Sequence, residues 1–116
     1  MKTRELLKLD SKTMADAIQS MKVKECEKHA INYAKMLGVS HDKAIMAAVH
    51  AAFISDQDEH VSMRVHKAVS EMASEESDCT EAEAIILSGL YLMLVYKKTN
   101  GFQLMDTLSS VLKGKS

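Results

Sequence analysis

The stretch AIILSGLYLMLVY, residues 84–96, decides the fold of this chain. Only Ser88 and Gly89 interrupt its apolar side chains, so a helix formed here is apolar on every side. The run is shorter than the about 20 residues that a helix needs to cross a bilayer, and runs of about 10–14 residues are more typical of buried helices. The stretch therefore predicts a helix inside a globular protein and no membrane span.

A second stretch, AIMAAVHAAFI at residues 44–54, is apolar all round except for His50. A domain of 116 residues has room at its centre for about one helix that is surrounded on all sides. Two such helices leave a surplus apolar face, and we expect that face to bind a second copy of the chain. The side chains predicted for this contact are those of Leu90, Tyr91 and Leu94.

Composition favours an all-α protein. The chain has no Pro, only four Gly and nine Met, and Met is both a good helix former and a filler of gaps between helices. A hydrophobic content of 47% is ordinary for a packed core, and 116 residues fit one domain. We therefore predict a single all-α domain, residues 1–116, folded as a compact bundle of five to six helices.

Capping signals divide the chain into helices. A Ser or Thr followed by an acid within the next turn is typical of a helix start, and Gly or Asn-Gly is typical of a helix end. The starts are Thr13 with Asp16, Ser40 before Asp42, Ser55 with Asp58, and Thr80 with Glu83, and the ends are Gly38 and Asn100-Gly101. The expected helices are 13–37 with a break near Ser20, 41–54, 55 to about 76, 81–98, and a last amphipathic helix that carries Leu104, Met105, Leu108, Val111 and Leu112.

The charge pattern argues against a nucleic-acid surface. The net charge is −1, and residues 56–83 hold nine acidic side chains against two basic ones. A DNA- or RNA-binding face usually gathers Lys and Arg with few acids between them. Cys26 and Cys79 are too few for a disulfide-stabilised secreted domain, and the first residues lack the apolar core of a signal peptide. We therefore expect a cytoplasmic protein that binds no nucleic acid.

Cys26 and His29 form the first candidate catalytic pair. Together with Tyr33 they follow one ridge of a helix, at positions i, i+3 and i+7. An imidazolium three residues away would lower the pKa of the thiol and give a nucleophilic or redox-active thiolate. In the alternative, Cys26 belongs to the core face of its helix, where a free cysteine behaves as a small hydrophobic side chain.

His50 is the third candidate catalytic residue, because it interrupts an apolar helix. A buried imidazole needs a hydrogen-bond partner, which a ligand, a carboxylate, an interface residue or a backbone carbonyl would supply. The helix-borne metal patterns His-Glu-x-x-His and Glu-x-x-His are absent, and Asp56 with His60 fits a surface ion pair better. We therefore expect no metal site and no cofactor.

Several segments together resemble the helical core of the carboxymuconolactone decarboxylase and alkyl hydroperoxidase D-like proteins. These segments lie within residues 7–69 and are LKLDSKT at 7–13, Cys26, Gly38-Val39-Ser40, the alanine-rich run 44–54 and a further helix that ends near Val69. The resemblance implies an all-helical fold that assembles as dimers, trimers or hexamers with active sites near subunit contacts. It also implies chemistry that ranges from thiol-dependent peroxide reduction to lactone decarboxylation.

The residues that carry the family's redox chemistry are only partly matched. The redox members use a Cys-x-x-Cys pair followed by a histidine four residues on. Cys26 matches the second cysteine, whereas Val23 stands at the position of the first and Ala30 at that of the histidine. Met14-Ala15 replaces the acid that lies upstream in those members.

Two classes of function follow from these patterns. The first is a small intracellular helical oligomer that acts as a binding or regulatory module without catalytic activity and takes a protein partner or a small apolar ligand. The second is a carboxymuconolactone decarboxylase-like or peroxidase-like enzyme that uses Cys26, His29 and His50. We favour the first class, because the paired cysteine of the redox members is missing.

Overall fold

The computed structural model describes residues 1–53 and 60–101, and within these ranges the chain contains helices and no strand. The helices are α1 (Thr3–Leu7), α2 (Ser11–Ser20), α3 (Val23–Leu37), α4 (His41–Phe53), α5 (Val61–Glu76) and α6 (Glu81–Lys98). This confirms the predicted all-α bundle. The predicted last helix beyond Gly101 lies outside the described residues, as does Ser55. The helix that was predicted to start at Ser55 begins instead at Val61, with His60 as its N-cap. No helix in the described ranges combines the length and the apolar character that a membrane crossing requires.

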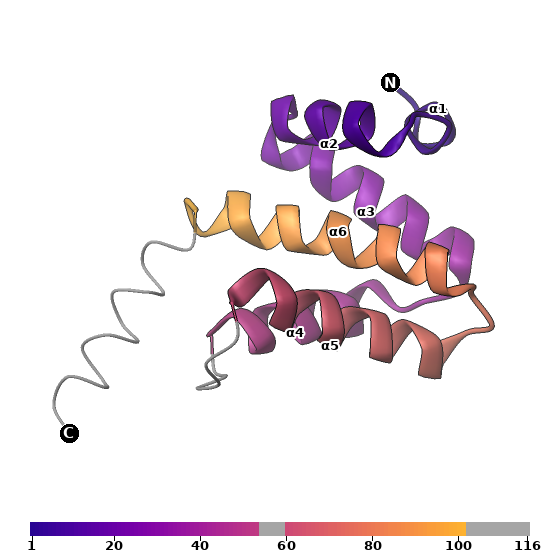
Figure 1. Cartoon of the computed structure of the whole chain (residues 1–116), viewed down its shortest axis with the longest axis vertical. Coiled ribbons are helices and arrows are strands. Elements are labelled where there is room, and N and C mark those ends of the chain that lie inside the picture. The colour runs from indigo at the N-terminus through magenta and orange to yellow at the C-terminus, as the bar shows by residue number, and fades with distance from the viewer. Residues whose placement is uncertain (54–59, 102–116) are drawn as a thin grey trace, which may run out of the picture.

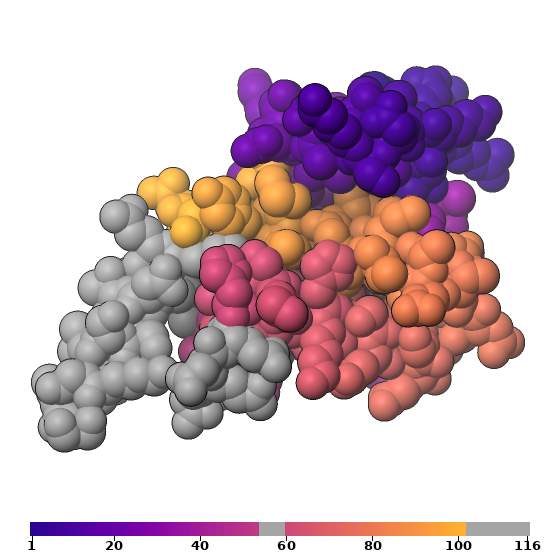
Figure 2. All heavy atoms as spheres, in the orientation of Figure 1, coloured from indigo at the N-terminus to yellow at the C-terminus, as the bar shows by residue number. Residues whose placement is uncertain are grey.

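Helix α6 occupies the middle of the bundle (Figure 1). Helices α1, α2 and α3 lie on one side of it and α4 and α5 on the other, so the fold has three layers. The space-filling view shows α6, in orange, as a band between the indigo α2 and the rose-coloured α5 (Figure 2). This position explains why the sequence of α6 is apolar. One side of α6 is not covered by another helix and remains visible between α2 and α5.

The core is built around α6. Leu87, Tyr91 and Leu94 are completely buried, and each fully buried large apolar side chain stabilises the fold by about 1.5–3 kcal/mol. The hydroxyl of Tyr91 donates to the carbonyl oxygen of Ala30 at 3.4 Å and lies 2.7 Å from Nδ1 of His41, so its polar end is paired. The neighbouring helices contribute smaller buried side chains, which include Ala30, Ala34, Ala44, Ala48, Val65 and Val69.

The residues predicted for a contact between chains lie inside one chain instead. Leu90 is 1% exposed, and Tyr91 and Leu94 are 0% exposed, because α3, α4 and α5 all pack against α6. The prediction that these three side chains form an interface is therefore corrected. The side of α6 that remains half-buried carries other side chains, namely Ile86, Gly89, Leu92 and Met93.

Helix α4 is not surrounded on all sides, which the apolar run 44–54 had led us to expect. It buries only the small side chains of Ala44, Ala48, Ala51 and Ala52. Met46 is 63% exposed, and His50 is exposed as well. The prediction of a buried His50 was therefore wrong: α4 packs through its alanines and through the half-buried Ile45, Val49 and Phe53, and His50 lies on the exposed side.

Most of the helix ends follow the predicted capping signals. Oγ1 of Thr80 accepts from the backbone N–H of Glu83 at 3.1 Å, and a Glu83 carboxylate oxygen accepts from the backbone N–H of Thr80 at 2.8 Å, which completes the capping box. Gly38 ends α3 in the left-handed conformation with φ of 76°. The break near Ser20 is confirmed, because α2 ends there and α3 begins at Val23.

The start of α2 was predicted at the wrong residue. Thr13 with Asp16 does not cap this helix; the cap is Asp10, whose carboxylate accepts from the backbone N–H of Thr13 at 2.8 Å and from its hydroxyl at 3.0 Å. These bonds lower the pKa of Asp10 below its usual value. Helix α1 was not predicted, because its five residues are too few to show a helical repeat.

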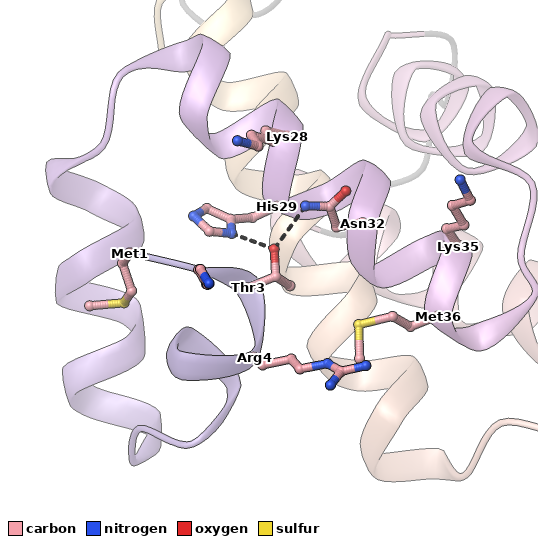
Figure 3. Close-up of a pocket in the computed structure, with 9 residues that line it drawn as sticks. Met1, Thr3, Arg4, Lys28, His29, Asn32, Lys35 and Met36 are labelled. Atoms are coloured by element: carbon pink, nitrogen blue, oxygen red, sulfur yellow. Dashed lines mark hydrogen bonds between the residues drawn. The ribbon is translucent and has the colours of Figure 1, made fainter.

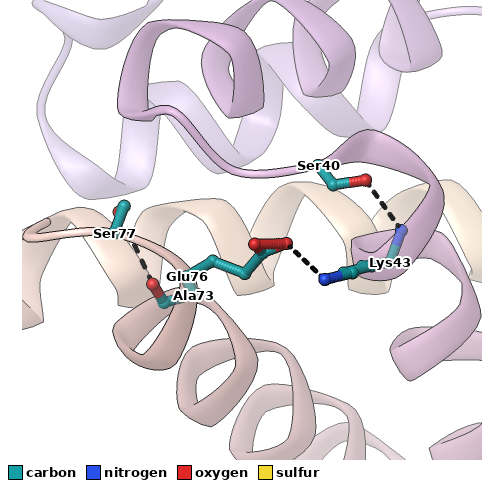
Figure 4. Close-up of polar contacts among 5 residues, drawn as sticks. All are labelled: Ser40, Lys43, Ala73, Glu76 and Ser77. Atoms are coloured by element: carbon teal, nitrogen blue, oxygen red, sulfur yellow. Dashed lines mark hydrogen bonds and ion pairs between the residues drawn. The ribbon is translucent and has the colours of Figure 1, made fainter.

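Polar contacts join the first turn of α4 to the end of α5 (Figure 4). Lys43 Nζ lies 3.3 Å from a carboxylate oxygen of Glu76, and the hydroxyl of Ser40 accepts from the backbone N–H of Lys43 at 3.3 Å. The hydroxyl of Ser77 reaches the carbonyl oxygen of Ala73 at 3.5 Å. Because Lys43 is largely exposed, the ion pair contributes at most about 1 kcal/mol. The α4–α5 layer is therefore held by apolar packing.

Candidate functional site

An apolar groove runs between α2 and α6. Its cavity has a volume of about 450 Å³, within the range of about 300–1,000 Å³ that is usual for ligand sites. One wall comes from the end of α1 and from α2 through Leu7, Leu9, Ser11, Met14, Ala15, Ile18 and Gln19. The opposite wall comes from α6 through Ile86, Gly89, Leu90, Leu92 and Met93. None of these twelve side chains carries a charge, so the groove is suited to an apolar ligand.

The groove continues toward the C-terminal end of α6. An adjoining cavity of about 330 Å³ shares Gln19, Leu92 and Met93 with it. The other residues of this second cavity are His60, Val61, Ser62, Tyr96 and Gly101. We call the two cavities together the α6 groove. It follows α6 from residue 86 to residue 96, which corresponds to about 15 Å at the helical rise of about 1.5 Å per residue.

Gly89 lies in the wall of this groove, in the interior of α6. A Cβ atom added at Gly89 would meet no atom of the described residues within 4 Å, so the fold itself does not require the small residue. Glycine in a helix interior costs about 1 kcal/mol relative to alanine. The chain therefore carries an unfavourable residue where an occupant of the groove could approach the α6 backbone closely.

Cys26, the predicted nucleophile, is completely buried in the core. Burial raises the pKa of its thiol, and the opposing effect of Lys97 is smaller. Cys26 lines neither cavity of the α6 groove, nor a cavity between α1 and α3, nor one between α5 and α6. These observations match the alternative in which Cys26 is a small hydrophobic side chain of the core.

His29 and His50 do not join Cys26 in one site. Nδ1 of His29 is hydrogen-bonded to the hydroxyl of Thr3 at 2.8 Å, which directs the ring toward α1. Burial lowers the pKa of His29, so the imidazolium that would activate the thiol is disfavoured. His50 is exposed on α4 and lines none of these four cavities.

A Ser-His contact that the sequence did not reveal joins α5 to α6. The hydroxyl of Ser88 is hydrogen-bonded to Nδ1 of His66, and it also donates to the carbonyl oxygen of Ile85 at 2.7 Å. Because Ser88 is 0% exposed, no substrate reaches its hydroxyl in this conformation. The contact satisfies a buried hydroxyl, and we assign it no catalytic role.

No family model, curated protein or solved structure matches the chain. The resemblance to the carboxymuconolactone decarboxylase and alkyl hydroperoxidase D-like proteins therefore stays a prediction from the motifs. Within residues 1–53 and 60–101, no group of three or more His, Cys, Asp or Glu side chains is placed to hold a metal ion. The α6 groove is the candidate site that the geometry supports best.

Proposed function

We propose that this chain is a small intracellular binding module without catalytic activity, and that its α6 groove receives an amphipathic helix from a second copy of the chain. The observation that carries the proposal is Gly89, an unfavourable residue in the wall of an uncharged groove with open space above it. The two cysteines are both free thiols, which is consistent with a reducing compartment.

A helix fits the groove better than a small rigid molecule. Helix-in-groove recognition places the apolar face of a helix, read as positions i, i+3, i+4 and i+7, into an elongated hydrophobic channel. The α6 groove is elongated, and Met14 and Met93 in its walls are side chains that adapt to an irregular partner. Gly89 would let the partner helix lie close to the α6 backbone.

The sequence supplies a helix of the required kind. Between residues 104 and 112 five apolar side chains recur at helical spacing, over about 12 Å of predicted helix, which is close to the length of the groove. This predicted helix lies outside the described residues. Its chemistry is complementary to the groove, and a helix exchanged between two copies gives a closed, symmetric dimer.

The alternative function is the carboxymuconolactone decarboxylase-like or peroxidase-like enzyme. It requires Cys26, His29 and His50 to act on one substrate. The burial of Cys26, the bond of His29 to Thr3 and the exposure of His50 on α4 give it no support. Turnover of a hydroperoxide with a thiol donor that is lost in Cys26→Ser and retained in Cys79→Ser would restore this alternative.

The proposal is tested by sedimentation velocity of the full chain at micromolar concentration. We expect the wild type to sediment as a dimer and Gly89→Leu, which fills the groove, to sediment as a monomer of 12.9 kDa. The matched control is Ala82→Leu, which adds the same side chain to an exposed position of α6 outside the groove and should leave the dimer intact. A monomeric wild type, or a dimer that Gly89→Leu does not weaken, would contradict the proposal.

A second pair of variants tests the occupant. Leu108→Asp places a charge on the apolar side of the predicted last helix, whereas Ser110→Asp places the same charge on its opposite side. We expect only Leu108→Asp to dissociate the dimer. If both variants remain dimeric, then the groove is occupied by something other than this helix.

A further inference from the structure

Another cavity, separate from the two that form the α6 groove, lies between α1 and α3 and is strongly basic. Its volume is about 490 Å³. The residues that line it are Met1, Lys2, Thr3, Arg4, Lys28, His29, Asn32, Lys35 and Met36. Four of these side chains are cationic and none is acidic, although the chain as a whole carries a net charge of −1. The local charge therefore favours an anionic ligand.

A hydrogen-bond chain lies in the middle of the residues that line this cavity, with Met1 and Lys28 on one side and Arg4 and Met36 on the other (Figure 3). The side-chain amide of Asn32 donates to the hydroxyl oxygen of Thr3 at 3.1 Å, and this oxygen lies 2.8 Å from Nδ1 of His29. Because Thr3 already accepts from Asn32, its own proton is available for Nδ1 of His29. When Thr3 donates this proton to Nδ1, the ring proton of neutral His29 lies on Nε2.

Nε2 of His29 is the feature that points to a ligand. His29 is only 2% exposed, and its Nε2 is buried without a hydrogen-bond partner among the described residues. Leaving a buried donor unpaired costs about 1–3 kcal/mol. Figure 3 shows the imidazole within the cavity, with Lys28 and Met1 on the side away from Thr3. Because this nitrogen is closed to solvent in the described conformation, a ligand oxygen would reach it and supply the missing acceptor after a neighbouring lining side chain shifts.

We propose that the cavity between α1 and α3 binds a small phosphorylated molecule, whose phosphate accepts a hydrogen bond from Nε2 of His29 and is neutralised by Lys28. A phosphate group carries about −1.5 to −2 charges at neutral pH and offers three acceptor oxygens. Arg4 lies toward the other end of the cavity, near Met36 (Figure 3), where it suits a second anionic group of the same molecule.

The protonation of His29 is compatible with this role. Burial lowers the pKa of its imidazole, an effect that the nearby Glu25 partly opposes and Lys28 reinforces. In the absence of a ligand the imidazole is therefore neutral near pH 7. With its proton on Nε2 it can donate one N–H to a phosphate oxygen. Because the ring is held by Thr3, little side-chain entropy is lost when a ligand binds.

The site is tested by calorimetric titration of the full chain with pyrophosphate at constant ionic strength. We expect saturable binding that weakens about fivefold in Lys28→Gln, the change that corresponds to about 1 kcal/mol for one lost charge contact. The matched control is Lys67→Gln, which removes a charge from the exposed side of α5 and should leave the affinity unchanged. Equal weakening by the two variants would indicate general charge attraction and overturn the proposal.

Nitrogen NMR of the histidine rings gives a second readout that needs no variant. Pyrophosphate should shift the Nε2 resonance of His29 and leave that of the exposed His50 in place. An unmoved His29 resonance at saturating pyrophosphate would also overturn the proposal. Citrate is the competing probe, and tighter binding of citrate than of pyrophosphate would contradict the assignment to phosphate.

Discussion

Replacing Gly89 by alanine should make a single chain more stable. Gly89 lies inside α6, where alanine is favoured over glycine by about 1 kcal/mol. The added Cβ meets no described atom within 4 Å, so no packing cost offsets this gain. For a domain of this size, 1 kcal/mol corresponds to an increase in Tm of about 4 °C. We expect this increase in thermal unfolding at a protein concentration low enough for the chain to be monomeric.

A larger side chain at position 89 should weaken the dimer. Gly89→Leu keeps a good helix former in α6 but fills the groove, so the monomer should remain folded while the dimer dissociates. Together, the two variants show whether Gly89 belongs to a binding surface or to the packed interior of one chain. A monomer of Gly89→Ala that is less stable than the wild type would show that the space above Gly89 is needed by the fold itself, and it would refute the reasoning.

Three further outcomes follow from the structure. Because burial raises the pKa of Cys26, a thiol reagent should modify the half-buried Cys79 first, and fast labelling of Cys26 in Cys79→Ser would contradict this. Burial lowers the pKa of His29 below its ordinary value of 6.5, so the unfolded chain binds more protons and the free energy of unfolding should fall as the pH drops below 6.5. Urea titrations below pH 6.5 should show a smaller fall in the free energy of unfolding for His29→Gln than for the wild type. Equal falls in the two proteins would contradict this prediction. Thr80→Ala breaks the capping box and should lower the free energy of unfolding by about 1 kcal/mol, which an unchanged urea midpoint would disprove.

The sequence predicted the helices well because their limits are set by local chemistry. The capping box of Thr80 and Glu83 and the left-handed Gly38 depend only on residues a few positions apart. The exceptions are the start of α2, where Asp10 and Thr13 both offer a capping side chain and Asp10 is the one that caps, and the start of α5, which is capped by His60. Helix α1 escaped prediction because it is held by tertiary contacts, such as that of Thr3 with His29.

The neighbours of each helix were harder to predict than its limits. A helical repeat shows which residues share a face, but it does not show which other helix covers that face. For this reason Leu90 was expected at a contact between chains and is buried within one chain, and His50 was expected inside and is exposed. The α6 groove had one signal in the sequence, Gly89 in an otherwise apolar helix, which we had noted only as an interruption.

Methyl NMR of the methionines tests the α6 groove most directly. Met14 and Met93 line the groove, whereas Met46 and Met63 are exposed on α4 and α5. On dilution of the full chain from a concentration at which it is dimeric, the proposal predicts that the Met14 and Met93 resonances move while those of Met46 and Met63 stay in place. Movement of Met46 or Met63 with Met14 and Met93 unchanged would place the contact on another surface and contradict the proposal.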